Sequence, residues 1–210
     1  MATKRSPPSA LKAARKTESL PPQRRREALP PSRTVKTLAK AERAALSAKP
    51  GKLKAVFLDR DGVINEMRKG DWVRNWSQFK WLPGAKEAAA LIRKKGYICL
   101  VISNQSCIGR GVVTKAAVDA INKRMVAELG RSGGRIDAVY VCPHRPDEGC
   151  ACRKPGTLNF KRAMRDFNLK PDEILFVGDN ESDREAARRV GCKFEMAGEK
   201  RGMLDIVRAL

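Results

Sequence analysis

The sequence of 210 residues is poor in histidine, in tyrosine and in long apolar runs. Its longest unbroken apolar run, Tyr97–Ile102, is far shorter than the roughly 20 residues that a helix needs to cross a bilayer, and we therefore exclude a transmembrane protein. The first 50 residues also lack an apolar segment of the length that a secretory signal needs. We therefore expect a cytoplasmic protein with reduced cysteines.

Acidic residues are scarce as well: 23 Asp and Glu stand against 44 Lys and Arg, a net charge of +21. Residues 1–50 hold 13 of the basic residues, only three Glu, and seven of the 12 prolines. We expect these residues to form a disordered basic leader with a weak helix over Thr34–Ala48, and residues 51–210 to form the folded domain. A tether for nucleic acid or for an anionic surface, and a targeting peptide, are alternative roles for the leader.

From residue 52 onward the pattern alternates between short apolar runs and segments with helical spacing. The expected strands are Leu53–Leu58, Tyr97–Ile102, Ile136–Val141, Glu173–Val177 and an edge strand at Lys193–Met196. The expected helices are Ala85–Lys95, Lys115–Leu129, Leu158–Phe167, Glu181–Val190 and a last one from Gly202. This alternation predicts an α/β fold, a Rossmann-like parallel sheet with helices on both faces.

Polar residues follow the predicted strands at the ends where an open α/β sheet binds its ligands. The first strand runs into Asp59-Arg60-Asp61-Gly62, the second into Ser103-Asn104-Gln105, and the fourth into Gly178-Asp179. Carboxylates from two strands can hold Mg²⁺ through oxygen atoms. One aspartate can then attack a phosphoryl group and form an aspartyl-phosphate.

These segments, in this order, resemble the haloacid dehalogenase superfamily. Its four motifs correspond to Phe57–Asn65, Ser103–Gln105, Arg153–Pro155 and Val177–Asp183. Within the superfamily the sequence most resembles the heptose-1,7-bisphosphate 7-phosphatases and histidinol phosphatases, which share the stretch Asn104–Gly111 and a zinc loop before Arg-Lys-Pro. The resemblance covers Lys54 to Phe194. Each motif alone also has a purely structural interpretation, such as a turn for Gly62 or a helix cap for Ser103 and Asn104.

The resemblance implies a role for each matching residue. Asp59 would be the nucleophile, and Asp61 the general acid and base, with a pKa raised by its environment. Mg²⁺ would bind Asp59, Asp179 and the backbone carbonyl of Asp61. The residues expected to bind the phosphate or the substrate are Ser103, Asn104, Gln105, Ser106, Arg110, Arg153 and Lys154.

The second constellation contains the only histidine of the sequence. Cys142, His144, Cys150 and Cys152 lie within 11 residues and supply three thiolates and one imidazole. Such a complete tetrahedral set predicts a structural zinc site, with reduced cysteines and an idle histidine as the alternative. The zinc would fix the loop before Arg153 and Lys154. We interpret Cys107, where related enzymes carry glycine, as a substitution and not as a second nucleophile.

Only 41 residues separate Asp61 from Ser103, too few for a cap domain. We therefore expect loops to close the site, namely residues 66–81 and the zinc loop. Aromatic side chains in the first loop could pack on a sugar or a base, or simply anchor the loop; they are Trp72, Trp76 and Trp81. Guanidinium groups could bind a second anionic group of the substrate, at Arg74, Arg110 and Arg153.

Two departures from the heptose-phosphatase pattern bear on the substrate. Asn180 stands where those enzymes carry Lys, and Pro155-Gly156-Thr157 is shorter than their Pro-x-Pro-Gly. The sequence therefore predicts a monomeric, Mg²⁺-dependent phosphomonoesterase that removes the 7-phosphate of heptose 1,7-bisphosphate. The alternatives are a phosphatase for histidinol phosphate or nucleic-acid ends, and a non-catalytic basic module that binds nucleic acid.

Overall fold

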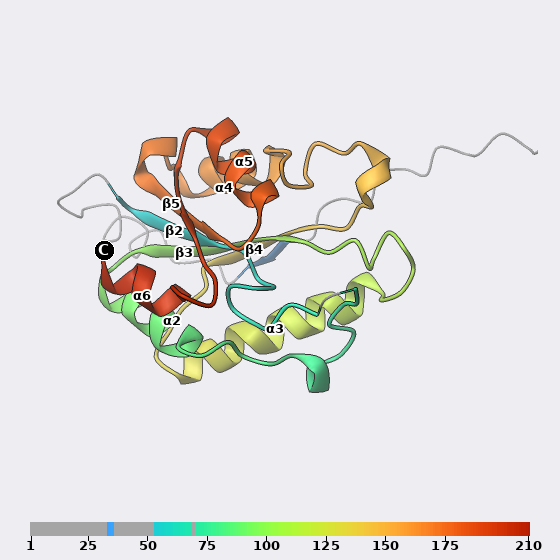
Figure 1. Ribbon diagram of the computed structural model, residues 1–210, viewed down its shortest axis with the longest axis horizontal. Coiled ribbons are helices and arrows are strands. Elements are labelled where there is room, and N and C mark those ends of the chain that lie inside the picture. The colour runs from blue at the N-terminus through green and yellow to red at the C-terminus, as the bar shows by residue number, and fades with distance from the viewer. Residues whose placement is uncertain (1–32, 36–52, 69) are drawn as a thin grey trace, which may run out of the picture.

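The computed structural model describes residues 33–35, 53–68 and 70–210, in which a six-stranded sheet lies between two layers of helices (Figure 1). The strands are β1 (Arg33–Val35), β2 (Ala55–Leu58), β3 (Ile98–Asn104), β4 (Ala138–Cys142), β5 (Ile174–Gly178) and β6 (Lys193–Met196). Their order across the sheet is β1-β4-β3-β2-β5-β6. Strands β2 to β6 run parallel, and the predicted fold class is confirmed.

Helices cover both faces of the sheet, as a parallel arrangement requires. One face carries α2 (Ala85–Lys94), α3 (Lys115–Arg131) and α6 (Met203–Arg208), and the other carries α4 (Leu158–Phe167) and α5 (Glu181–Val190). Short 3₁₀ turns lie in the loops: η1 (Trp76–Gln78), η2 (Pro146–Glu148) and η3 (Pro171–Glu173).

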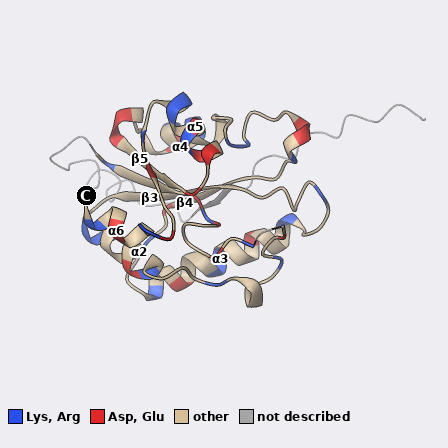
Figure 2. Ribbon diagram, viewed as in Figure 1, with Lys and Arg blue, Asp and Glu red and all other residues tan. Residues whose placement is uncertain are grey.

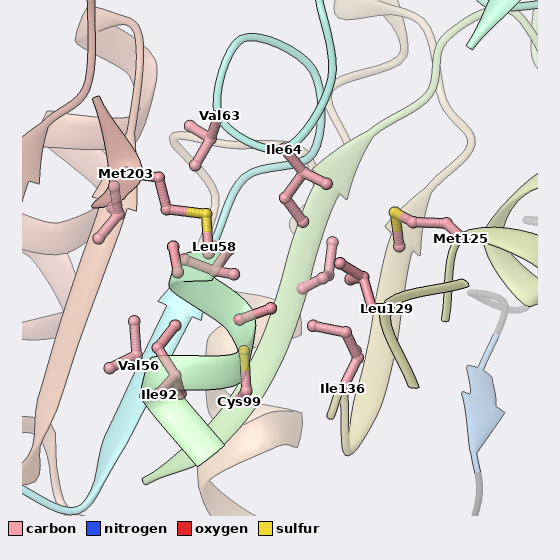
Figure 3. Close-up of a cluster of buried hydrophobic side chains, with 14 of the residues drawn as sticks. Val56, Leu58, Val63, Ile64, Ile92, Cys99, Met125, Leu129, Ile136 and Met203 are labelled. Atoms are coloured by element: carbon pink, nitrogen blue, oxygen red, sulfur yellow. The ribbon is translucent and has the colours of Figure 1, made fainter. Parts of the chain in front are cut away.

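Residues of β2 alternate between the two faces and so join two separate cores. Val56 and Leu58 pack in one cluster with Ile92 of α2 (Figure 3). Phe57 belongs to the other cluster, where its ring lies 6.0 Å from that of Phe160 on α4. Burial on both faces explains why the strands are apolar throughout.

Two helices begin at residues whose side chains form a cap. Thr114 accepts a hydrogen bond from the backbone of Ala117 at the start of α3. Asn180 accepts one from the backbone of Asp183 at the start of α5. Both helices begin at the residue that the sequence predicted, because an N-cap oxygen satisfies an otherwise unpaired amide.

Part of the predicted leader belongs to the sheet. Arg33–Val35 pair antiparallel with Ala138–Tyr140 of β4. The helix expected over Thr34–Ala48 is therefore wrong at its start, since Thr34 and Val35 are in a strand. The remainder of that helix, and of the leader, lies outside the described residues.

The segment between Asp61 and Ser103 carries no inserted domain in its described residues. These contain η1, α2 and the first part of β3 as their only helices and strands. This agrees with the expectation that no cap domain fits there. None of the helices that the structure describes combines the length and the apolarity needed to cross a membrane.

Candidate active site

The polar residues after the three central strands converge at one edge of the sheet. β2 pairs with β3 on one side and β5 on the other, and Leu58 lies between Val101 and Val177. Asp59 directly follows β2, and Asp179 directly follows β5. The two aspartates are far apart in the sequence, and the register of the sheet brings them together.

Three carboxylates meet there around one lysine. One oxygen from each of Asp59, Asp179 and Asp183 lies within 4.8 Å of the other two. Lys154 is almost completely buried, and its Nζ lies 2.8 Å from Asp59 Oδ1 and 2.8 Å from Asp183 Oδ1. Nζ also donates a hydrogen bond to the carbonyl of Ile102 at 3.0 Å.

The cluster holds more negative than positive charge, and the pKa values reflect this. Burial, together with the charge of Asp183, raises the pKa of Asp59 to about 7 against the lowering effect of Lys154. Burial and the same neighbour raise the pKa of Asp179 to about 6. A divalent cation would remove this imbalance, and three carboxylates form the all-oxygen donor set that suits Mg²⁺. The residues present therefore fit the predicted metal.

Asp183 is a member of this cluster that the sequence analysis placed in the fourth motif but gave no role in the site. It lies in the first turn of α5, is fully buried, and accepts a hydrogen bond from the backbone of Asp179. Its spacing four residues after Asp179, on a helix that starts at the strand end, was the available signal.

Two glycines leave room for the carboxylates. Gly62 has φ +84°, and a Cβ at this position would overlap the carboxylate of Asp179. A Cβ on Gly178 would overlap the side chain of Asp183. Both positions therefore require glycine for reasons of space, and Gly62 also for its left-handed backbone.

Asp61 lies outside the carboxylate cluster, enclosed by donors. Its Oδ1 accepts from Asn65 Nδ2 at 2.9 Å, and its Oδ2 accepts from Gln105 Nε2 at 2.7 Å. Arg60 NH2 contacts both oxygens, at 3.1 and 2.9 Å. Burial alone would raise the pKa of Asp61, but the Arg60 charge and these hydrogen bonds hold it below its usual value. The predicted raised pKa is therefore wrong for the free protein.

The side chains predicted to bind phosphate have different surroundings. Ser103 is buried, and its hydroxyl accepts from Gln105 Nε2. The amide of Asn104 pairs with the backbone of Lys154, accepting from its N–H at 3.0 Å and donating to its carbonyl at 3.2 Å. These residues thus link the predicted phosphate site to Lys154 and, through Gln105, to Asp61.

A cleft of about 190 Å³ opens beside this network. It is lined by Arg60, Asp61, Met67, Arg68, Asp71, Trp72, Val73, Asn104, Gln105, Ser106 and Arg153. A larger hollow of about 380 Å³ lies elsewhere, next to Leu53 and Phe194, and carries none of the predicted site residues.

The cleft contains some of the predicted aromatic and basic residues but not others. Trp72 lines it, whereas Trp76 and Trp81 pack with Phe79, Trp76 stacked at 4.6 Å. Arg153 also lines the cleft and has no carboxylate partner among the described residues.

The other two predicted arginines do not line the cleft. Arg74 pairs with Asp71, 2.7 Å away. The guanidinium of Arg110 lies over the ring of Trp72, 5.8 Å from its centroid. Of the three arginines, only Arg153 therefore lies where a second anionic group in the cleft could reach it directly.

The predicted zinc ligands form a compact cluster at the end of β4. Their three sulfurs lie 3.3, 3.6 and 3.7 Å apart. His144 Nδ1 lies 3.6 Å from Cys142 Sγ and 3.2 Å from Cys152 Sγ. Zinc bonds of about 2.3 Å in a tetrahedron would separate two sulfurs by about 3.8 Å, so the spacing fits one zinc ion. Arg153 and Lys154 follow this cluster directly.

The other cysteines lie apart from the cluster. Cys99 and Cys107 are buried and Cys192 is half-buried. Burial raises the pKa of the Cys107 thiol, which disfavours the thiolate that a nucleophile needs. This agrees with the interpretation of Cys107 as a substitution.

Asn180 has two roles where related enzymes were expected to carry lysine. Besides capping α5, it donates from Nδ2 to Asp179 Oδ1 at 2.9 Å. It therefore holds the Asp179 carboxylate without adding a charge.

Comparison with known proteins matches this chain to phosphatases. A model of the HAD-hydrolase-like family matches residues 151–196. D-glycero-alpha-D-manno-heptose-1,7-bisphosphate 7-phosphatase of Mycobacterium bovis is 40% identical over 136 residues, covering 64% of this chain and 72% of that protein. D-glycero-beta-D-manno-heptose-1,7-bisphosphate 7-phosphatase of Bordetella bronchiseptica is 35% identical over 140 residues, covering 67% and 78%.

A comparison with solved structures also matches this chain to a phosphatase. The crystal structure of D,D-heptose 1,7-bisphosphate phosphatase from B. bronchiseptica, complexed with magnesium and phosphate, superimposes with a TM-score of 0.66. The sequence identity is 32%, and the match covers 74% of this chain and 86% of that one.

Proposed function

Because the chain belongs to the HAD-like hydrolases and is a phosphoric monoester hydrolase, we propose that it removes the 7-phosphate of D-glycero-D-manno-heptose 1,7-bisphosphate. The observation that carries the proposal is the meeting of Asp59, Lys154 and Asp179 at the strand ends, beside a cleft that holds Asp61 and Arg153. Magnesium dependence, an aspartyl-phosphate and a structural zinc are parts of the same proposal.

In the first step an oxygen of Asp59 attacks the phosphorus atom and forms an acyl-phosphate bond. The bond from phosphorus to the sugar oxygen breaks, and Asp61 gives its proton to that oxygen. In the second step Asp61 takes a proton from water, whose oxygen attacks the phosphorus and releases Asp59. Lys154 neutralises the phosphoryl oxygens and holds the Asp59 carboxylate, 2.8 Å away.

Asp61 has a lowered pKa in the free protein, which suits the second step but not the first. A phosphate dianion in the cleft would bring a like charge next to it. Like charges disfavour the charged form of a carboxyl group, so substrate binding would raise the pKa of Asp61 and load it with the proton for the leaving group.

Asp59, Asp179 and Asp183 are the residues that would hold Mg²⁺, together with the backbone carbonyl of Asp61. When bound, Mg²⁺ supplies positive charge that shields the attacking carboxylate from the negative charge of the substrate. Cys142, His144, Cys150 and Cys152 would hold zinc, which fixes the loop that carries Arg153 and Lys154.

Arg153 accounts for the preference for a bisphosphate. It lines the cleft, and no described carboxylate competes for its guanidinium. Guanidinium groups bind phosphate through two parallel hydrogen bonds, so Arg153 is suited to hold the phosphate that is not hydrolysed. Trp72 lines the same cleft and offers an apolar face to the sugar between the two phosphates.

The test is kcat/KM on a panel of phosphate esters with Mg²⁺. The panel contains both anomers of heptose 1,7-bisphosphate, the heptose 7-phosphate, histidinol phosphate, and oligonucleotides with 3′ or 5′ phosphates. We expect the bisphosphate to be preferred, and ³¹P NMR to show that the 7-phosphate is released. Preference for histidinol phosphate or for oligonucleotide ends would contradict the proposed substrate.

Two variants examine the role of the second phosphate. Arg153→Ala should raise KM for the bisphosphate and leave KM for the 7-monophosphate nearly unchanged. Arg131→Ala is the matched control, because Arg131 is exposed at the end of α3, does not line the cleft, and should change neither value. An equal effect of Arg153→Ala on both substrates would remove the assignment of Arg153.

A further inference from the structure

One buried arginine stands between the two aspartates of the first motif. Arg60 is 1% exposed. Its NH2 group contacts both oxygens of Asp61 and donates to Gln105 Oε1 at 3.0 Å. Its NH1 group donates to Asn122 Oδ1 at 3.0 Å. The guanidinium therefore bridges Asp61 to a residue 62 positions from Arg60 along the chain.

Asn122 lies on α3, a helix held in place by the core. It is fully buried on the same helix as Ile121 and Met125, which belong to the larger hydrophobic cluster. Among the described residues, Asn122 is the only side chain bonded to Arg60 that lies outside the two strand-end loops. The helix thus supplies a fixed point against which Arg60 is held.

Arg60 in turn determines the orientation of Gln105. Because Oε1 of Gln105 accepts from Arg60, its Nε2 is turned toward Asp61 Oδ2 and Ser103. Both oxygens of Asp61 are therefore held, directly or through Gln105, by one guanidinium. A buried ion pair is seldom the most stabilising solution for a core position, since apolar side chains of similar volume often do as well or better. A buried arginine at position 60 is explained if the Asp61 carboxylate has to be held in one position.

We propose that Arg60, anchored by Asn122 of α3, is a positioning residue that places the Asp61 carboxyl group for proton transfer to the leaving oxygen. The inference rests on the proposed function, in which Asp61 is the general acid. Neither Arg60 nor Asn122 needs to touch the reacting atoms. Their effect passes through Asp61 and should appear only when proton transfer to the leaving group matters.

Leaving groups of different basicity separate this role from a structural one. A sugar alkoxide is strongly basic and leaves only with a proton, whereas p-nitrophenolate is weakly basic and leaves without one. The value of kcat/KM reports the transfer to Asp59, the step in which the leaving group departs. The experiment therefore compares kcat/KM on heptose 1,7-bisphosphate and on p-nitrophenyl phosphate, in wild type and Asn122 variants.

Asn122→Leu removes the acceptor for Arg60 and keeps a side chain of similar size. We expect kcat/KM on the sugar phosphate to fall roughly tenfold or more, since a positioned acid contributes about 10²–10⁴-fold, and the p-nitrophenyl value to change by less than about threefold. Asn122→Asp retains an acceptor. The ratio of kcat/KM on the sugar phosphate to kcat/KM on p-nitrophenyl phosphate should therefore return most of the way to its wild-type value. Ile121→Val, a core change on the same helix, should leave the ratio at the wild-type value. If Asn122→Leu does not fold, Asn122→Ala, which also lacks an acceptor, replaces it.

Equal losses on both substrates would overturn the positioning role and make the Arg60–Asn122 contact purely structural. A ratio shifted as much by Ile121→Val as by Asn122→Leu would overturn it too. If the wild-type protein turned over p-nitrophenyl phosphate but not the heptose bisphosphate, the proposed substrate would fail, and another alkyl phosphate that it accepts would serve in the comparison. If it turned over no phosphate ester, both proposals would fall.

Discussion

At the residue scale, Asp179 can lie close to the loop after β2 because residue 62 is a glycine and has no side chain. Gly62 follows the two aspartates of the first motif, and its missing Cβ leaves the space that the Asp179 carboxylate occupies. Its φ of +84° is also a conformation that other residues adopt at a cost. This glycine is therefore part of the metal site that we propose, although it has no ligand atom.

We predict that Gly62→Ala displaces Asp179 and weakens Mg²⁺ binding by at least about tenfold, because even a displacement of about 1 Å in a functional group is costly. Titration calorimetry with Mg²⁺ measures the change. Gly70→Ala is the matched control, since Gly70 also has a positive φ but a Cβ added there would meet no atom within 4 Å. Unchanged affinity in Gly62→Ala would contradict the proposed role of Asp179.

The raised pKa of Asp59 has a consequence for stability. A carboxyl with a pKa of about 7 in the folded protein and about 3.8 when unfolded binds more protons in the folded state. The free energy of unfolding therefore falls as the pH rises from about 4 to about 7, by at most roughly 1.4 kcal/mol per pH unit. Asp59 thus destabilises the metal-free fold at neutral pH.

Asp59→Asn should accordingly have a higher Tm than wild type in EDTA at pH 8, because its side chain is uncharged and still accepts from Lys154. The difference should shrink toward zero near pH 4, and Mg²⁺ at pH 8 should raise the wild-type Tm more than that of the variant. Differential scanning calorimetry across this range measures both effects. A variant that melts below wild type at every pH would show that the charge of Asp59 is already balanced without metal.

The sequence correctly predicted that residues directly after the central strands lie in the candidate site. Asp59 and Asp179 could be found because apolar runs lead directly into them. The role proposed for Arg60 could not be predicted, because it depends on Asn122, 62 residues from Arg60 on a helix. The lowered pKa of Asp61 could not be predicted either, because it depends on how Arg60, Asn65 and Gln105 surround the carboxylate in the folded chain. Asp183 was missed because an aspartate in the first turn of a helix usually interacts with the helix end at the surface.

At the scale of elements, the loop after β4 connects the cysteine cluster to the predicted phosphate site. Cys152 directly precedes Arg153 and Lys154, and its backbone carbonyl accepts from Asn159 of α4. Arg153 also donates to the carbonyl of His144 within the same loop, at 3.4 Å. A metal in the cluster would thus fix the direction of both basic side chains.

We predict that protein purified without chelator holds about one equivalent of zinc, since the four ligands form one closed tetrahedral set. Cys150→Ser should lose the zinc and lower kcat/KM by about tenfold or more, in the range found when residues that support a metal site are removed. Elemental analysis and phosphate release measure the two effects. Cys192 lies outside the cluster, so Cys192→Ser should retain the zinc and the wild-type kcat/KM. Zinc-free wild-type protein with full activity would contradict the prediction.

The sequence predicted the helices and the parallel strands well, because burial patterns and caps mark them locally. The strand β1 escaped because Arg33–Val35 is short, lies in a basic segment, and pairs with a strand far along the chain, β4.

At the scale of the whole molecule, charged side chains are spread over the outer helices, whereas the candidate active site lies at one edge of the sheet. Figure 2 shows basic and acidic residues interspersed on the outer helices α2 to α6. The described surface thus contains many local ion pairs, such as Glu185 with Arg188 and Arg189. Residues 1–50, which hold 13 of the 44 basic residues, lie mostly outside the described part of the chain.

The proposed reaction needs only the edge of the sheet where β2, β3 and β5 end, together with the loop after β4 that carries Lys154. The nucleophile, its lysine and the carboxylate cluster come from separate segments that the parallel sheet brings to one edge. If this arrangement is the active site, one atom in it should be indispensable: the carboxylate oxygen of Asp59 that forms the bond to phosphorus.

The most direct test is the rate of phosphate release from heptose 1,7-bisphosphate with Mg²⁺, in wild type and in Asp59→Asn. The amide cannot form the acyl-phosphate, so we predict that the variant stays folded and loses at least about 10³-fold in kcat, the scale seen when a nucleophile is removed. A variant that releases phosphate at the wild-type rate would contradict the account.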